Sequence, residues 1–168
     1  MQFILIDRIT DLQPGKSVTA VKALTLAEEY LKDHFPRFPV MPGVLMLEAM
    51  FQASAWLVYY SEDFAKPYLT LKEARNIKYN DFVKPGELLT LQAEIVKHDD
   101  QTTSLKAQGF LGESLAVSGR LVLQRSLLVE RFPDRPTTDG YMRQRLRQIF
   151  RLLYPSYVEG AVAPAAGE

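Results

Sequence analysis

The chain has 168 residues, 47% of them hydrophobic and 24% charged, which is typical of one globular domain. This composition excludes a mostly disordered chain, a collagen-like chain and a long coiled coil. The 20 basic and 20 acidic side chains balance, which argues against duplex nucleic acid as a partner, since that ligand selects a concentrated positive face. The absence of cysteine excludes disulfides and a thiolate nucleophile, and two histidines are too few for a His-rich metal site.

Two apolar segments bear on targeting and membranes. The run Phe3–Ile6 is ended by two charged residues and is too short for the core of a signal peptide, so we expect a cytoplasmic protein. Residues 43–60 are apolar over the length of a membrane span, but Glu48 and Gln52 stand within them, where a lipid-facing carboxylate is costly. We therefore predict no transmembrane segment, and a long helix buried in the core of the protein.

The remaining elements follow in chain order. A strand, a turn and a second strand are expected over residues 3–25, followed by a short helical turn near 26–32. Three prolines in HFPRFPVMPG exclude a regular helix there, and this segment leads into the long helix. Alternating apolar residues and turn signals predict strands at 68–71, 74–79, 88–97, 102–111 and 114–124. We predict an α+β fold in which a curled, mostly antiparallel sheet wraps one long central helix.

Residues 126–168 differ in character, and we expect a first domain at 1–125 followed by a C-terminal extension. A linker, RFPDRPTTD, precedes an amphipathic helix at about 140–154, which Pro155 ends before a flexible tail. The apolar face of this helix consists of Met142, Leu146, Ile149, Phe150 and Leu153, and the other faces carry Arg143, Arg145, Arg147 and Arg151. Either the apolar face packs on the body of the protein or on a neighbouring subunit, or the arginines form a docking face for an acidic carrier protein or an anionic membrane surface.

His34 and Glu48 are the two side chains best suited to move protons near neutral pH. Imidazole changes its charge in that range, and Glu48 follows 14 positions later, among apolar residues of the long helix. Gly43 and Val44 begin that helix, where free backbone N–H groups and the helix dipole stabilise an oxyanion. A base, an acid and an oxyanion site suit proton abstraction next to a carbonyl with protonation of a nearby leaving group. Taken alone, each residue also has a structural interpretation: a histidine in a turn, or a glutamate that satisfies a buried backbone group.

The string HFPRFPVMPGVLMLEAMFQASAW, residues 34–56, resembles the signature of the FabZ-type 3-hydroxyacyl-acyl carrier protein dehydratases. In that family the run is His-Phe-Pro-x-His-Pro-x-x-Pro-Gly-Val-Leu, followed by Glu-Ala-x-x-Gln on the helix. The flanking segments FILIDRITDLQPGKSVTAVKALT and EARNIKYNDFVKPGELLTLQAEIVK also resemble the family. The resemblance covers roughly residues 3–124 and leaves the C-terminal extension outside it.

The resemblance implies a hotdog fold and a homodimer whose two active sites each combine the histidine of one subunit with the glutamate of the other. It implies that His34 removes the α proton, that Glu48 protonates the departing 3-hydroxyl, and that the Gly43 N–H polarises the thioester carbonyl. Gln52 matches the helix glutamine of the family, which either holds the carboxyl group or packs in the core or interface. The implied product is a trans-2-enoyl thioester in fatty-acid or related lipid or polyketide biosynthesis. The substrate would ride the phosphopantetheine arm of acyl carrier protein, no metal or organic cofactor is implied, and family dimers often assemble into hexamers.

Two positions depart from the family pattern. Phe38 stands where the family has its second histidine, and it follows Arg37, which either contacts the carrier protein or is simply solvated. Asn80 and Asp81 stand where the family is often basic, which weakens the electrostatic case for carrier docking and leaves coenzyme A as an alternative carrier. The remaining basic candidates for docking are Lys72, Arg75, Lys78 and Lys84.

Two other functions remain open at this point. A hotdog acyl thioesterase would hydrolyse the thioester with a carboxylate and water, although the spacing from His-Phe-Pro to Glu48 argues against it. A non-catalytic hotdog subunit would bind acyl chains or support a catalytic partner, although both proton-transfer residues are retained. The sister family of isomerising dehydratases uses an aspartate on the helix, so Glu48 favours dehydration without migration of the double bond.

Overall fold

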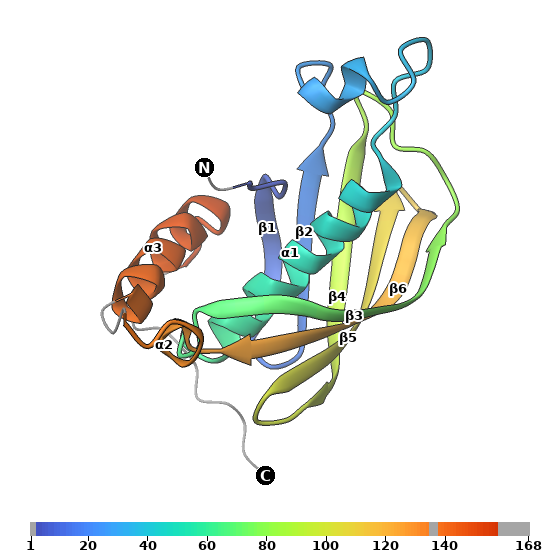
Figure 1. Ribbon diagram of the computed structural model, residues 1–168. Coiled ribbons are helices and arrows are strands. Elements are labelled where there is room, and N and C mark those ends of the chain that lie inside the picture. Colours follow the sequence, from blue (N-terminus) through green and yellow to red (C-terminus); the bar gives the residue numbers. More distant parts are fainter. Residues whose placement is uncertain (1–2, 135–137, 158–168) are drawn as a thin grey trace.

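In the computed structural model, which describes residues 3–134 and 138–157, six strands form one sheet in the order β1-β2-β4-β5-β6-β3 (Figure 1). All five strand pairings are antiparallel. The strands are β1 (Arg8–Gln13), β2 (Ser17–Ala23), β3 (Tyr68–Tyr79), β4 (Leu88–His98), β5 (Thr102–Leu111) and β6 (Ser114–Ser126). The helical elements are η1 (Glu29–Lys32), α1 (Gly43–Ser61), α2 (Leu128–Arg131) and α3 (Thr138–Leu153). The predicted α+β fold, one long helix wrapped by a curled antiparallel sheet, is confirmed.

α1 is the predicted long helix, and it lies across the sheet while β3 curls around it (Figure 1). Ala49, Ala53 and Leu57 are completely buried, and the two alanines let the helix backbone approach the strands closely. Within the described residues, no helix is long and apolar enough to cross a membrane. Burial against the sheet therefore explains the apolar residues on one side of this helix.

Two predicted strands differ in the structure. β1 begins at Arg8 rather than at residue 3. The Asp7 N–H still donates to the Val21 carbonyl of β2, but the Leu5 N–H donates to the side chain of Gln52 on α1. The segments at 68–71 and 74–79 are one strand, β3, which has register shifts at Leu71/Glu73 and Arg75/Lys78 in its pairing with β6. These irregularities interrupt the alternation of apolar residues although the strand itself is continuous. The sequence pattern therefore predicted two strands where the structure has one.

The C-terminal extension packs on the body of the protein. Residues 128–131, for which no helix was predicted from the sequence, form the short helix α2, and the predicted linker begins at its last residue. The Asp139 carboxylate accepts hydrogen bonds from the backbone N–H groups of Leu128 and Val129, at 2.7 and 3.1 Å, and joins α3 to α2. Four of the five residues of the predicted apolar face of α3 are buried, with Phe150 completely covered, and Met142 is half-buried. The predicted flexible tail lies, from residue 158 onward, outside the described residues.

Candidate active site

His34 lies two residues after the end of η1, and short-range contacts hold it. Its backbone N–H donates to the Tyr30 carbonyl at 3.0 Å, and its Nδ1 lies 2.9 Å from the carbonyl oxygen of Val40. Because a carbonyl oxygen can only accept, Nδ1 carries the hydrogen in this contact. In the neutral ring, Nε2 then has the free electron pair, so the histidine is prepared to act as a base through that atom.

The backbone next to His34 is strained. Phe35 has a φ of 56°, which is rare for a bulky side chain and costs on the order of 1–3 kcal/mol. The segment is held from its other end by the hydrogen bond from the Met41 N–H to the Val83 carbonyl, at 2.9 Å. The prolines that exclude a helix therefore lie in a loop that fixes the position of the imidazole.

A cavity of about 290 Å³ opens beside His34 at the beginning of α1. Its lining consists of His34, Met41, Gly43, Met46, Tyr79, Asn80, Asp81 and Phe82. A Cβ at Gly43 would lie only 3.1 Å from Cε1 of Tyr79, so a side chain there would press on that ring. Gly43 and Val44 are the first residues of α1, where backbone N–H groups have no acceptor within the helix. The cavity thus brings a base and a candidate oxyanion donor together.

Glu48 lines a second, elongated cavity of about 170 Å³ on the side of α1. The amide of Gln52 donates to Oε1 of Glu48 at 2.9 Å and to the Phe3 carbonyl at 3.1 Å. The Gln52 Oε1 accepts from the Leu5 N–H at 2.9 Å, which fixes the orientation of the amide. The N-terminal segment therefore orients the carboxyl group of Glu48 through Gln52, and leaves Oε2 as the oxygen that can carry a proton.

The structure brings some of the predicted site residues together and separates others. Gly43 shares a cavity with His34, and Gln52 contacts Glu48, but His34 and Glu48 line different cavities of the one chain. Five residues separate Gly43 from Glu48, which is about 7–8 Å along the helix axis at 1.5 Å per residue. Within one chain, the predicted base and acid are therefore displaced from each other along α1.

The other predicted residues lie at the surface. Arg37 is exposed, and Val44 is 70% exposed although it begins a helix of the core. Phe38 is half-exposed, and its ring meets that of Phe82 edge-on at 5.8 Å, beside the His34 cavity. Phe38 therefore contributes apolar surface where the family has an imidazole.

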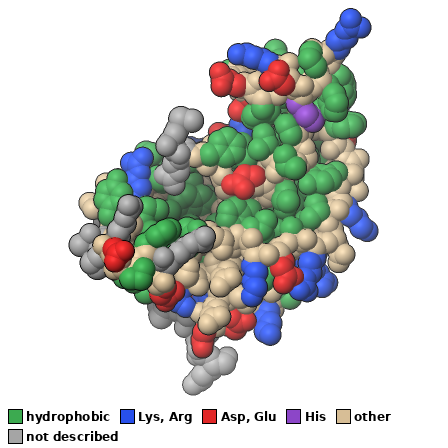
Figure 2. Space-filling model, viewed as in Figure 1, with side chains coloured by type: hydrophobic (Ala, Val, Ile, Leu, Met, Phe, Trp, Pro, Cys, Tyr) green, Lys and Arg blue, Asp and Glu red, His purple; other side chains and the backbone are tan. Residues whose placement is uncertain are grey.

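An apolar face joins the two cavities. Figure 2 shows hydrophobic side chains gathered across the face toward the viewer, over α1 and the loop before it. The exposed large residues beside the His34 cavity are Phe35, Phe38, Val44, Tyr79 and Phe82, with exposed fractions between 48% and 70%. Contiguous apolar surface of this kind marks an interaction site.

Several lining residues were not singled out as site residues from the sequence, and three of them come from segments outside the motif. Tyr79 lies at the end of β3, and Phe3 lies in the N-terminal segment. Leu146 belongs to α3 and reaches the Glu48 cavity from about a hundred residues further along the chain. The sequence places Leu146 only on the apolar face of α3. An apolar face predicts that the residue is buried, but it does not predict which surface the helix packs against.

Among known families, the FabA-like domain matches this chain over residues 1–123. A 3-hydroxyacyl-[acyl-carrier-protein] dehydratase FabZ of Levilactobacillus brevis is 37% identical over 118 residues, which cover 70% of this chain and 80% of the relative. The FabZ of Variovorax paradoxus is 39% identical over 123 residues, covering 71% and 82% of the two chains.

Solved structures confirm the hotdog fold. A chain of the dehydratase heterocomplex ApeI:P from Xenorhabdus doucetiae matches with a TM-score of 0.62 and 18% identity, over 77% of this chain and 88% of that one. A mutant thioesterase from Pseudomonas aeruginosa matches with a TM-score of 0.57 and 13% identity, over 72% and 81%. At these identities the likeness concerns the fold alone, and the fold is shared by dehydratases and thioesterases.

Proposed function

This chain belongs to the FabA-like domain family, and we propose that it removes water from a 3-hydroxyacyl thioester to give the trans-2-enoyl thioester. The proposal is carried by one observation: both proton-transfer residues of the motif are present, and a hydrogen bond orients each of them beside a cavity. The FabZ relatives are dehydratases of 3-hydroxyacyl groups carried on acyl carrier protein.

The first proton transfer involves His34. The Val40 carbonyl keeps the hydrogen of the ring on Nδ1, so Nε2 accepts the proton from the carbon next to the thioester carbonyl. The electron pair of that C–H bond moves toward the carbonyl oxygen as the proton leaves. The Gly43 N–H, at the positive end of α1, stabilises the negative charge that develops on this oxygen.

The second proton transfer involves Glu48 in its protonated form. The Gln52 amide occupies Oε1, so the proton is delivered from Oε2 to the 3-hydroxyl as the bond between C3 and oxygen breaks. Water leaves and the double bond forms between C2 and C3. His34 then holds the proton taken from the substrate, and Glu48 has given its own proton to the departing water. Transfer of one proton from His34 to Glu48 restores the site without any other reactant.

We infer that the site is completed by a second copy of the chain, with His34 from one subunit and Glu48 from its partner. The separation of the two residues into different cavities supports this, as does the apolar face between them. β3 is an edge strand of the sheet and ends at Tyr79, which is half-exposed on this face. The same edge is available for pairing with another strand. Assembly of such dimers into hexamers stays a prediction.

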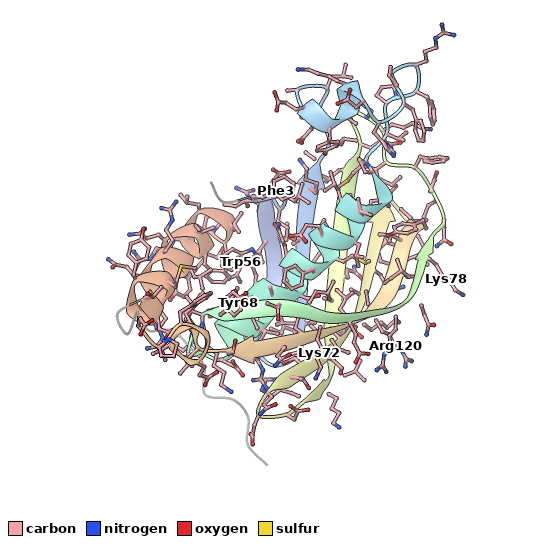
Figure 3. All side chains as sticks on the ribbon, viewed as in Figure 1. Phe3, Trp56, Tyr68, Lys72, Lys78 and Arg120 are labelled. Atoms are coloured by element: carbon pink, nitrogen blue, oxygen red, sulfur yellow. The ribbon has the colours of Figure 1, made fainter. Side chains whose placement is uncertain are left out.

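We also propose acyl carrier protein as the carrier, in a cytoplasmic setting. Lys72, Lys78 and Arg120 are exposed on β3 and β6, at one edge of the protein (Figure 3). Lys78 directly precedes Tyr79, which lines the His34 cavity, so a carrier bound to these side chains would lie close to the reacting groups. A cluster of cations suits an acidic carrier, and such binding would weaken as salt is added.

The test is to give the purified chain a 3-hydroxyacyl thioester and, separately, a saturated acyl thioester of the same length. Dehydration predicts the absorbance of a conjugated enoyl thioester from the first substrate and no free thiol from either. Free thiol from both would identify a thioesterase, and no reaction of either substrate would indicate a non-catalytic subunit. The His34→Ala variant, prepared in the same way, is the control for a contaminating dehydratase.

A further inference from the structure

The cavity at Glu48 has a polar end and an apolar end. Glu48 and Gln52 form the polar end, and the cavity continues along α1 past side chains that are almost entirely apolar or aromatic. The apolar part of the lining consists of Phe3, Ile4, Phe51, Ala55, Trp56, Tyr59, Leu69 and Leu146. A carboxyl group at the mouth of an apolar groove suits a ligand that carries a polar reacting centre on a hydrocarbon chain. We call this cavity the acyl groove.

Leu146 is the residue of α3 that lines the acyl groove. Phe150, one helical turn after Leu146, has its ring 5.9 Å from that of Trp56 and 5.1 Å from that of Tyr60. These contacts place α3 over the second half of α1, whereas Glu48 belongs to the first half. Figure 3 shows Phe3, Trp56 and Tyr68 in the region between α3 and α1, and Figure 2 shows a hollow there with hydrophobic side chains around it.

α3 is fixed in this position by polar contacts as well as by its apolar face. The Arg147 guanidinium donates to the carboxylate of Asp63 at 2.9 Å and lies over the ring of Phe64, 5.5 Å from its centroid. At the other end of the helix, Asp139 binds the backbone of α2. Leu146 itself is 4% exposed, so its side chain is held between these two attachments and forms a firm surface.

Resting on the proposed function, we propose that α3 is the end wall of the acyl groove, and that Leu146 limits the length of the acyl chain that is dehydrated. The FabA-like match ends at residue 123, so this wall comes from a part of the chain outside the family match. Because Leu146 from α3 lines the same groove as Glu48, we expect a preference for acyl chains that end before they reach this wall.

The first test is the chain-length profile of kcat/KM for a series of 3-hydroxyacyl thioesters. Leu146→Phe should lower the ratio of long-chain to short-chain kcat/KM, and Leu146→Ala should raise it, each by roughly tenfold or more for the first methylene that meets the wall. The matched control is Leu152→Ala, on the same helix, because Leu152 is 79% exposed and outside the groove. Ratios that stay at the wild-type value in both Leu146 variants, with thermal unfolding showing that they fold, would overturn the proposal.

The second test does not depend on catalysis. Trp56 is the single tryptophan of the chain and lines the acyl groove, so its fluorescence reports occupancy there. Saturated acyl-coenzyme A esters should change the emission only once the acyl chain is long enough to reach Trp56. Leu146→Phe should shorten the longest ester that binds, and an unshifted cut-off would overturn the proposal.

The two tests separate this proposal from the proposed function. If the wild-type chain dehydrates no thioester but the fluorescence cut-off changes in the Leu146→Phe variant, the proposed function is contradicted and the proposed role of α3 is supported. If dehydration proceeds while neither the chain-length profile nor the cut-off changes in the Leu146 variants, the proposed role of α3 is contradicted and the proposed function is supported.

Discussion

His34 and Glu48 are held in place by contacts of different range along the chain. The imidazole is oriented by the carbonyl of Val40, six residues away, and the carboxyl group by Gln52, whose partners are 47 and 49 residues away. The histidine end of the site is thus formed by one short loop, which contains both the strained residue Phe35 and the carbonyl that orients the imidazole. The glutamate end depends on the N-terminal segment and, through the acyl groove, on the extension. Substitutions in these distant segments should therefore disturb the position of Glu48 more than that of His34.

Despite this difference, both ends are required equally for chemistry. His34→Ala and Glu48→Gln should each lower kcat by about 10²–10⁴-fold, because each removes a positioned base or acid. The melting temperature should change little, since both side chains lie on cavities rather than in the core. The measurement is the rate of enoyl thioester formation. Near-normal turnover of Glu48→Gln would show that another group supplies the proton.

The largest expected loss of stability lies in the extension. Phe150 is completely buried among the rings of Trp56, Tyr60 and Phe64, so Phe150→Ala should lower the free energy of unfolding by about 3–5 kcal/mol. Leu152→Ala, on the exposed side of the same helix, should change it by no more than about 0.5 kcal/mol. Urea unfolding measures both values. Equal effects of the two variants would mean that α3 does not pack as described.

A smaller effect on the rate is expected from substituting Gln52, which links the N-terminal segment to Glu48. Gln52→Leu removes the donor that orients Glu48, and a misplaced group costs up to about 10²-fold in rate, so we expect kcat to fall by roughly ten- to a hundred-fold. KM should hardly move, because the substrate still fits the groove. Gln92→Leu, at an exposed position of β4, is the matched control. If Gln52→Leu lowers only the melting temperature and leaves kcat unchanged, Gln52 is a structural residue and does not position the acid.

The smallest effect is expected in a hairpin built, like the His34 loop, by local contacts. The N–H groups of Thr102 and Gln101 hydrogen-bond the Asp99 carboxylate and lower its pKa from 3.8 to about 2. Since the pKa is lowered on folding, this stabilisation is present above the ordinary value and disappears as the pH falls toward 2. Asp99→Asn should therefore reduce the melting temperature slightly at neutral pH and not near pH 2. A difference that persists in acid would assign the effect to packing.

The same distinction explains what the sequence could predict. The spacing from His34 to Glu48 and the prolines before α1 are local patterns of the sequence. The strands β4, β5 and β6 also follow local patterns, and each was placed correctly to within two residues. The structure supplies the contacts between distant segments: Gln52 with residues 3 and 5, and Leu146 with the acyl groove. A hydrophobic stripe has the same pattern whatever surface it covers, so α3 could be expected to pack but not to line a cavity.

The central claim is that one active site takes His34 from one subunit and Glu48 from its partner, and mixing two inactive variants tests it most directly. Equal amounts of His34→Ala and Glu48→Gln are allowed to exchange subunits, exchange is verified by mass spectrometry, and enoyl thioester formation is measured. Half of the dimers are then mixed, each with one intact site, so about a quarter of wild-type activity should return. Each variant incubated alone is the control. Activity that stays at the level of the separate variants after complete exchange would contradict a site shared between subunits.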